Sequence, residues 1–103
     1  MCSFLFTNKE IEDLDYVNRY MEDRGPDSTN IVEVGDYTFI HNLLSISGEF
    51  TPQPFLNEER QIACVYNGEI YNYREIALRL KSEGVVLRST SDTEVLLHAY
   101  ILW

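Results

Sequence analysis

The chain has 103 residues, of which 45 % are hydrophobic and 13 % aromatic, so the composition predicts a packed globular chain and excludes a disordered one. Its formal charge of −9, from 17 acidic and 8 basic residues, would repel a phosphate backbone and argues against a nucleic-acid partner. The length predicts a single domain over residues 1–103. No stretch approaches the roughly 18 apolar residues of a membrane span, and no secretory signal is visible, so we expect no membrane partner and a cytoplasmic protein.

The cysteines and histidines give no pattern of a metal site or a disulfide framework. Cys2 and Cys64 are too few for such a framework, and His41 and His98 lie on separate segments. We therefore predict no metal and no cofactor.

The N-terminal third predicts a strand, a helix and a loop. Met1 to Phe6 is a short apolar run typical of a buried strand. A helix capped by Thr7 or Asn8 is expected to end near Asp23, because apolar residues recur at helical spacing and acidic residues gather at its start. The following Arg24-Gly25-Pro26-Asp27 cluster cannot continue a helix and predicts a loop.

The middle of the chain predicts three strands. Ile31 to Val34 and Tyr37 to Ile46 are rich in strand formers and are separated by Gly35-Asp36, so we expect an antiparallel hairpin with Phe39 and His41 on one face. A loop is expected over residues 47–59, followed by a strand from Arg60 to Tyr66.

Asn67-Gly68, at the end of that strand, admits two interpretations. Asn-Gly between strand formers predicts a tight type I′ turn, in which both residues have positive φ. The same pair also leaves a side-chain amide and a backbone N–H at a strand end, where two donors can converge on a developing oxyanion.

The C-terminal third predicts two helices with a short strand between them. Tyr73 to Ser82 has helical periodicity and Gly84 is placed to end it, while Val85 to Leu87 predicts a strand. Ser91 or Asp92 caps the last helix, with Glu94 near its start. That helix is apolar around almost its whole circumference, so we expect a second copy or a partner chain to bury it.

Six segments, in order, resemble the class II glutamine amidotransferase domain of asparagine synthetases, a family of N-terminal-nucleophile hydrolases. They are Met1-Cys2, Arg24-Gly25-Pro26-Asp27, His41 with Leu44-Ser45-Ile46, Gln53-Pro54, Asn67-Gly68-Glu69-Ile70-Tyr71-Asn72 and Ser91-Asp92-Thr93-Glu94. The resemblance covers nearly the whole chain but about the first half of that family's domain. It implies an α+β fold, an antiparallel β-sheet with helices packed on one face, like the first half of an αββα sandwich.

The resemblance also implies a site and a reaction. Once Met1 is removed, the thiol of Cys2 would attack the side-chain amide of glutamine while its α-amino group acts as the base, giving glutamate and ammonia. The other implied roles are the oxyanion hole for Asn67 and Gly68, substrate binding for Glu69, Asp92 and Ile46, and the site entrance for Arg24.

Three departures from the family pattern bear on activity. Leu43 stands where the family places an arginine that binds the substrate carboxylate, and Ser3 replaces a glycine beside the nucleophile. The chain also accounts for one sheet and its helices, whose open face a second copy would cover. The alternative to a glutaminase is therefore an inactive remnant of the fold that binds a ligand or a partner chain. In a third interpretation the motifs are only turns and caps.

Overall fold

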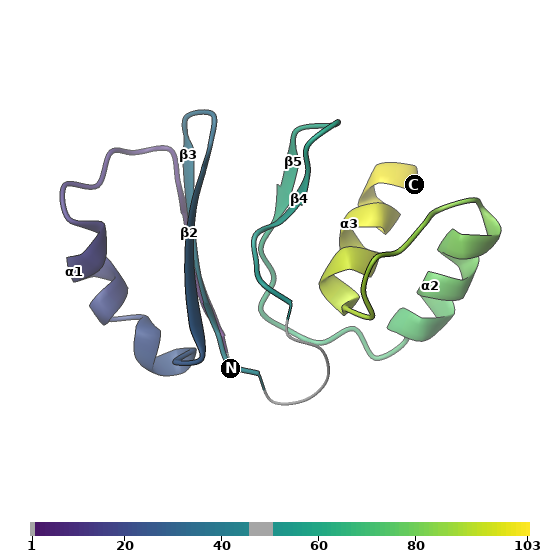
Figure 1. The fold of residues 1–103 in the computed structure, drawn as a ribbon, viewed down its shortest axis with the longest axis horizontal. Helices are drawn as coiled ribbons and strands as arrows, with labels where there is room; N and C mark the ends of the chain where they lie inside the picture. The colour runs from purple at the N-terminus through teal and green to yellow at the C-terminus, as the bar shows by residue number, and fades with distance from the viewer. Residues whose placement is uncertain (1, 46–50) are drawn as a thin grey trace.

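Four layers make up the fold in the computed structural model, which describes residues 2–45 and 51–103. Helix α1 lies outside the sheet β1-β3-β2, the sheet β4-β5 follows, and α2 and α3 lie on the far side (Figure 1). The expected α+β class with antiparallel pairing is confirmed. Each sheet carries its helices on one face only, and the second sheet, which the sequence did not predict, covers the open face of the first.

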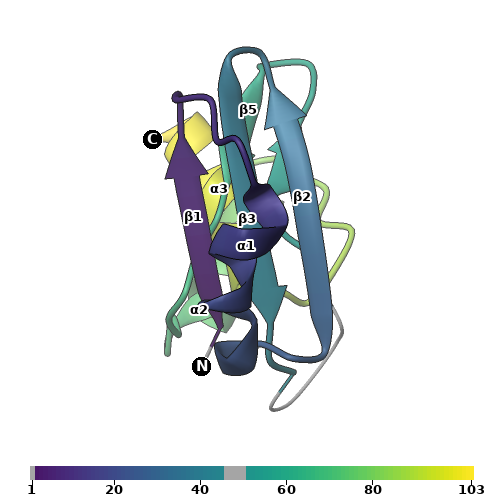
Figure 2. The ribbon, with the colours of Figure 1, turned by 90° about the vertical axis from the view of Figure 1, so that its left-hand side faces the viewer.

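The first sheet consists of β1 (Ser3–Thr7), β2 (Ser28–Val34) and β3 (Tyr37–Leu43). β2 and β3 form the predicted hairpin, and β1 pairs antiparallel with the other edge of β3 (Figure 2). The register places Phe4 opposite His41 and Phe6 opposite Phe39, so the predicted common face of Phe39 and His41 is confirmed. That face turns toward the second sheet, because a hollow of about 470 Å³ between the sheets is lined by Phe4, Phe6 and Phe39 on one side and Ala63 and Cys64 on the other.

The opposite face of this sheet carries α1 (Leu14–Arg19) and the 3-10 turn η1 (Glu22–Arg24). Buried Asn42 of β3 donates from Nδ2 to Oδ1 of Asn18 at 2.8 Å, which fixes the helix to the strand. The helix predicted from residue 7 or 8 to 23 is wrong in extent. It begins later because Asp13 is the cap, accepting the N–H of Tyr16 at 2.9 Å, and after Arg19 the chain tightens into η1.

The second sheet is a short antiparallel pair, β4 (Phe55–Asn57) and β5 (Ile62–Cys64). The prediction of a loop over residues 47–59 is wrong where β4 forms, and the strand predicted from Arg60 to Tyr66 is shorter than expected. β4 has only three residues and directly follows Pro54, so its sequence carries almost no periodic signal.

Two helices cover the outer face of the second sheet, with α3 against β4 and β5 and α2 beside α3. α2 (Tyr73–Ser82) has the predicted bounds. Gly84, with φ of 93°, follows it, and Val85 N–H bonds to Leu80 O at 3.0 Å, as in a Schellman motif. The strand predicted over Val85 to Leu87 does not form.

The last helix, α3 (Asp92–Leu102), finds part of its burial within the chain. Thr93, Glu94, Val95 and Leu97 are buried. Arg79 of α2 lies 4.3 Å from the centre of the Trp103 ring, so the end of the chain packs back on α2. Tyr100, Leu102 and Trp103 remain substantially exposed.

Candidate active site

A cleft of about 740 Å³ brings together most of the predicted site residues. Its lining includes Cys2, Asn67, Gly68, Glu69 and Asp92. These residues come from the start of β1, the segment after β5 and the start of α3, three regions far apart in sequence.

The Cys2 sulfur lies against the end of β3. The backbone N–H of Leu44 donates to Sγ at 3.3 Å, and the thiol lies 3.7 Å from the carbonyl oxygen of the same residue. This contact follows from the β1–β3 register, which pairs Ser3 with Asn42 and so leaves Cys2 beside the residues that follow Leu43. Cys2 is half-buried, and its sulfur contacts the backbone of Leu44 on one side of the cleft.

Asn67 reaches Cys2 directly. Its Nδ2 donates to the carbonyl oxygen of Cys2 at 2.8 Å. A side-chain amide has two N–H donors, so the second is available to another acceptor in the cleft. Cys2 and the Asn67-Gly68 pair therefore line the same cleft, with the Asn67 amide bonded to the backbone of Cys2.

The type I′ turn predicted for Asn67-Gly68 does not form. The described residues with positive φ are Gly35, Gly84 and Gln61, so neither Asn67 nor Gly68 adopts the conformation that this turn requires. Gly68 is instead constrained by space, because a Cβ there would lie 2.7 Å from the hydroxyl oxygen of Tyr66. Burial raises the pKa of that hydroxyl, and Asp92 and Glu69 raise it further, so at neutral pH it stays protonated.

Asp92 lies at the first turn of α3, where a side chain can reach the segment that follows Gly68. Its Oδ2 accepts the N–H of Ile70 at 3.0 Å, while the neighbouring Ser91 caps the helix by accepting the N–H of Thr93 at 3.1 Å. Of the two predicted caps, the structure thus uses Ser91. The carboxylate of Asp92 lines the cleft together with that of exposed Glu69, which gives the site two anionic groups.

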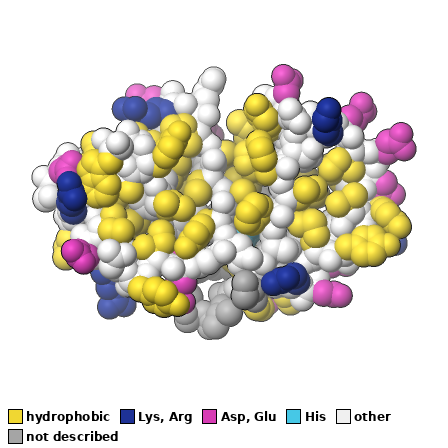
Figure 3. Space-filling model, turned by 180° about the vertical axis from the view of Figure 1, so that it is seen from behind, with side chains coloured by type: hydrophobic (Ala, Val, Ile, Leu, Met, Phe, Trp, Pro, Cys, Tyr) yellow, Lys and Arg dark blue, Asp and Glu magenta, His cyan; other side chains and the backbone are white. Residues whose placement is uncertain are grey.

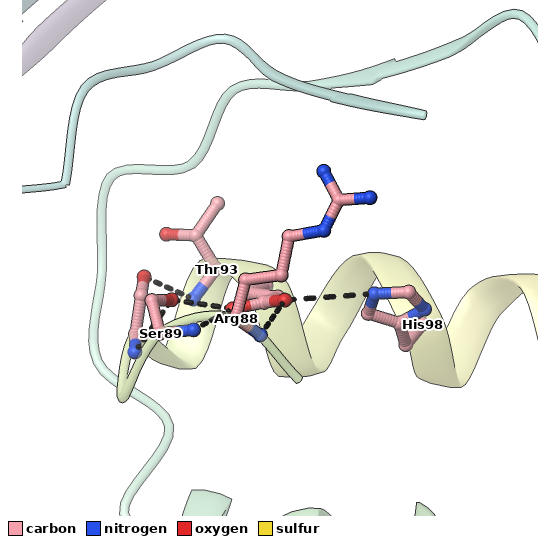
Figure 4. A network of polar contacts seen from close by, with 6 residues as sticks. Arg88, Ser89, Thr93 and His98 are labelled. Atoms are coloured by element: carbon pink, nitrogen blue, oxygen red, sulfur yellow. Dashed lines mark hydrogen bonds and ion pairs between the residues drawn. The ribbon is translucent and has the colours of Figure 1, made fainter. Parts of the chain in front are cut away.

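A buried carboxylate holds the loop that leads into α3. Glu94 is 1 % exposed, and its two oxygens accept the N–H groups of Arg88 and Ser89, each at 2.7 Å (Figure 4). His98 lies one turn later, with Nε2 3.7 Å from Glu94 Oε1. These bonds fix residues 88–91 against the helix and so set the direction from which Asp92 enters the cleft.

The other two predicted substrate-binding residues are not among the described residues that line the cleft. Arg24 is exposed in η1 and is not among the residues that line the cleft, and Ile46 falls outside the described residues. The cluster around Arg24 instead supports the cleft wall. A Cβ at Gly25 would lie 2.1 Å from the backbone oxygen of Asn42, and Asp27 Oδ2 accepts the N–H of Ser45 at 2.7 Å.

The sequence also matches a known family along its whole length. The family model described as "Glutamine amidotransferase domain" matches residues 1–103. The chain belongs to this family. No solved structure gives a significant match.

Asparagine synthetases are among the similar proteins. This amidotransferase domain is 34 % identical over 98 residues to asparagine synthetase [glutamine-hydrolyzing] 3 of Bacillus subtilis, covering 92 % of the chain and 16 % of that protein. It is 38 % identical over 88 residues to asparagine synthetase [glutamine-hydrolyzing] 1 of Arabidopsis thaliana, covering 82 % of the chain and 14 % of the relative. The chain thus spans about a sixth of the length of these relatives.

Several residues that line the cleft were not predicted from the sequence as site residues. Gln53 and Tyr66 line it, as does Arg74, the one cation among the described lining residues. Gln53 was visible only as part of a Gln-Pro motif, and its contacts to residues 13 and 40 positions away leave no local signal. Arg74 sits in the first turn of α2, where periodicity predicts only an exposed side chain.

The second cysteine is not part of the cleft. Cys64 lines the apolar hollow between the sheets, where burial raises the pKa of its thiol and disfavours a thiolate. Among residues 2–45 and 51–103, no group of three or more His, Cys, Asp and Glu side chains is arranged to hold a metal ion. In the same part of the chain, every helix is too short or too polar to cross a bilayer.

Proposed function

We propose that this domain hydrolyses glutamine to glutamate and ammonia, with Cys2 as the nucleophile after removal of Met1. The observation that carries the proposal is the 2.8 Å contact between the Asn67 amide and the carbonyl of Cys2 on one wall of a cleft. An oxyanion donor must lie close to the attacking atom, and the contact of Asn67 with the backbone of Cys2 supports that role for its second N–H.

Each step of the reaction can be assigned to a residue of the cleft. The α-amino group of Cys2 takes the thiol proton, and the sulfur attacks the side-chain amide carbon of glutamine. The second N–H of Asn67 and the backbone N–H of Gly68 hold the oxyanion. The protonated amine then returns its proton to the departing ammonia, and water cleaves the thioester to give glutamate.

The charges of the cleft suit an amino-acid substrate. Glu69 and Asp92 supply negative charge for an α-ammonium group. Leu43 offers the substrate carboxylate no charge, so binding is expected to be weak. Arg74 is the lining cation that can partly compensate.

Glutamate release by the purified protein tests the proposal. Intact-mass measurement first establishes the fraction of protein that lacks Met1, and the Cys2→Ala variant serves as the control. We expect glutamate release that scales with the processed fraction and falls to background in Cys2→Ala. Equal rates in the two proteins would end the proposal.

Leu43 favours a second candidate, a module that keeps the fold and binds an amino acid or a partner chain without hydrolysing it. This module would bind glutamine equally well with Met1 retained, because no free α-amine is needed. Calorimetric titration of glutamine into Cys2→Ala, combined with an inactive processed wild type, would favour it over the glutaminase.

A further inference from the structure

Gln53 is a buried polar residue that bonds to three separate segments of the chain, two of which line the cleft. It is 6 % exposed and lies just before β4. We propose that Gln53 is a positioning residue for glutamine hydrolysis, which holds Tyr66 and thereby aligns the donors of Asn67 and Gly68 with Cys2. This inference rests on the proposed function.

The two ends of the Gln53 amide are both engaged. Oε1 accepts the backbone N–H of Tyr66 at 2.6 Å, and Nε2 donates to Oγ1 of Thr93 at 3.2 Å. The backbone carbonyl of Gln53 accepts from Nδ2 of Asn30 at 2.9 Å. One residue therefore ties β2, the strand end after β5 and the first turn of α3 to each other.

The segment that carries the donors has little other support. The pairing of β5 with β4 ends at Cys64, and within the described ranges no backbone–backbone hydrogen bond involves residues 65–69. Tyr66 directly precedes Asn67, and its backbone N–H is fixed by a hydrogen bond to the side chain of Gln53. Without that bond the strand end can move relative to Cys2, and misplacements near 1 Å cost catalysts about 100-fold.

Thr93 extends the same argument to substrate binding. It follows Asp92 in α3, and the carboxylate of Asp92 accepts the N–H of Ile70. Gln53 and Asp92 thus hold the two ends of the stretch from Tyr66 to Ile70, one at each side of Asn67. A glutamine can satisfy both Tyr66 N–H and Thr93 Oγ1, whereas a glutamate retains only the acceptor.

Substitutions at Gln53 separate positioning from general stability. We expect Gln53→Leu, measured on protein without Met1, to lower kcat about 10- to 100-fold while KM for glutamine changes less than about threefold. Gln53→Glu keeps the acceptor for Tyr66 and should recover part of kcat. Leu80→Ala, at a buried position of α2, is the stability control and should lower the melting temperature while leaving kcat unchanged.

Amide hydrogen exchange provides a readout that does not depend on activity. Gln53→Leu should speed exchange of the Tyr66 amide at least about tenfold relative to Leu80→Ala, and Gln53→Glu should not. An active wild type with unchanged kcat in Gln53→Leu would overturn the inference. If the processed wild type releases no glutamate, the proposed function fails, and unchanged Tyr66 exchange in Gln53→Leu would then overturn the inference as well.

Discussion

Leu43 is the residue whose replacement should change function most directly. It lines the cleft at the end of β3 and cannot pair with a carboxylate. We expect Leu43→Arg to tighten glutamine binding about ten- to a hundredfold, because a charge-assisted hydrogen bond contributes roughly 1.5–3 kcal/mol. Calorimetry on the Cys2→Ala background measures this change apart from hydrolysis.

The control for that experiment is Leu43→Met, which adds no charge and should leave affinity for glutamine unchanged. Glutamine amide, which lacks the α-carboxylate, should bind Leu43→Arg no better than the parent protein. Equal gains for both ligands would show that the arginine acts somewhere other than on the carboxylate.

His41 should make stability depend on pH. It is 1 % exposed between the sheets, its Nε2 has no hydrogen-bond partner among residues 2–45 and 51–103, and burial lowers its pKa. The unfolded chain therefore binds a proton at a higher pH than the folded chain, so stability is lost as pH falls below about 6.5 toward the folded pKa. Urea unfolding between pH 7.5 and 5.5 should reveal this loss.

Replacing His41 by leucine should remove that dependence. At pH 7.5 we expect the free energy of unfolding of His41→Leu to stay within about 1 kcal/mol of the parent, because the substitution deletes a buried polar atom that bonds to none of the described residues. At pH 5.5 the variant should be the more stable of the two. Parallel losses in both proteins would assign the pH dependence to other groups.

At the scale of elements, the sequence predicted those that rest on local signals. α2 has its predicted bounds because its periodicity, its last turn and Gly84 all lie within a few residues of each other. The β2–β3 hairpin is equally local, with Gly35 at φ of 60° in its turn.

Elements decided by distant contacts were predicted less well. Residues 85–87 look like a strand, but none of the described strands pairs with them, and the loop that follows is held by the carboxylate of Glu94 instead. Asn67-Gly68 looks like a hairpin turn, yet neither residue has positive φ, and the Asn67 side chain instead bonds to the carbonyl of Cys2. In the same way, Cys2, Asn67 and Asp92 line the cleft whereas Arg24 does not, and the contacts of Gln53 leave no local signal in the sequence.

At the scale of the whole molecule, the two sheets and the helices packed on them bury enough apolar side chains to form a core in a short chain. The first sheet buries Phe39 and Ile40, and the helices over the second sheet bury Leu80, Val95 and Leu97. The layers nevertheless leave apolar surface open. Hydrophobic side chains are spread over much of the face seen from behind (Figure 3), and β1 is an edge strand whose outer side pairs with no other strand in the described part of the chain.

That surface predicts self-association. Phe4 and Phe6 on the edge strand are 44 % and 52 % exposed beside the hollow between the sheets, and soluble monomers rarely expose large contiguous apolar patches. We expect a homodimer in sedimentation equilibrium, since a second copy can pair the β1 edge and cover these rings.

Phe6→Glu should shift the protein to monomer, because the charge would be buried at the contact, whereas Tyr20→Glu, at a 75 % exposed position beside α1, should leave the dimer intact. A wild type that stays monomeric across the concentration series would mean that the open sheet edge is tolerated in water, and the partner predicted for the apolar last helix would lose its support as well.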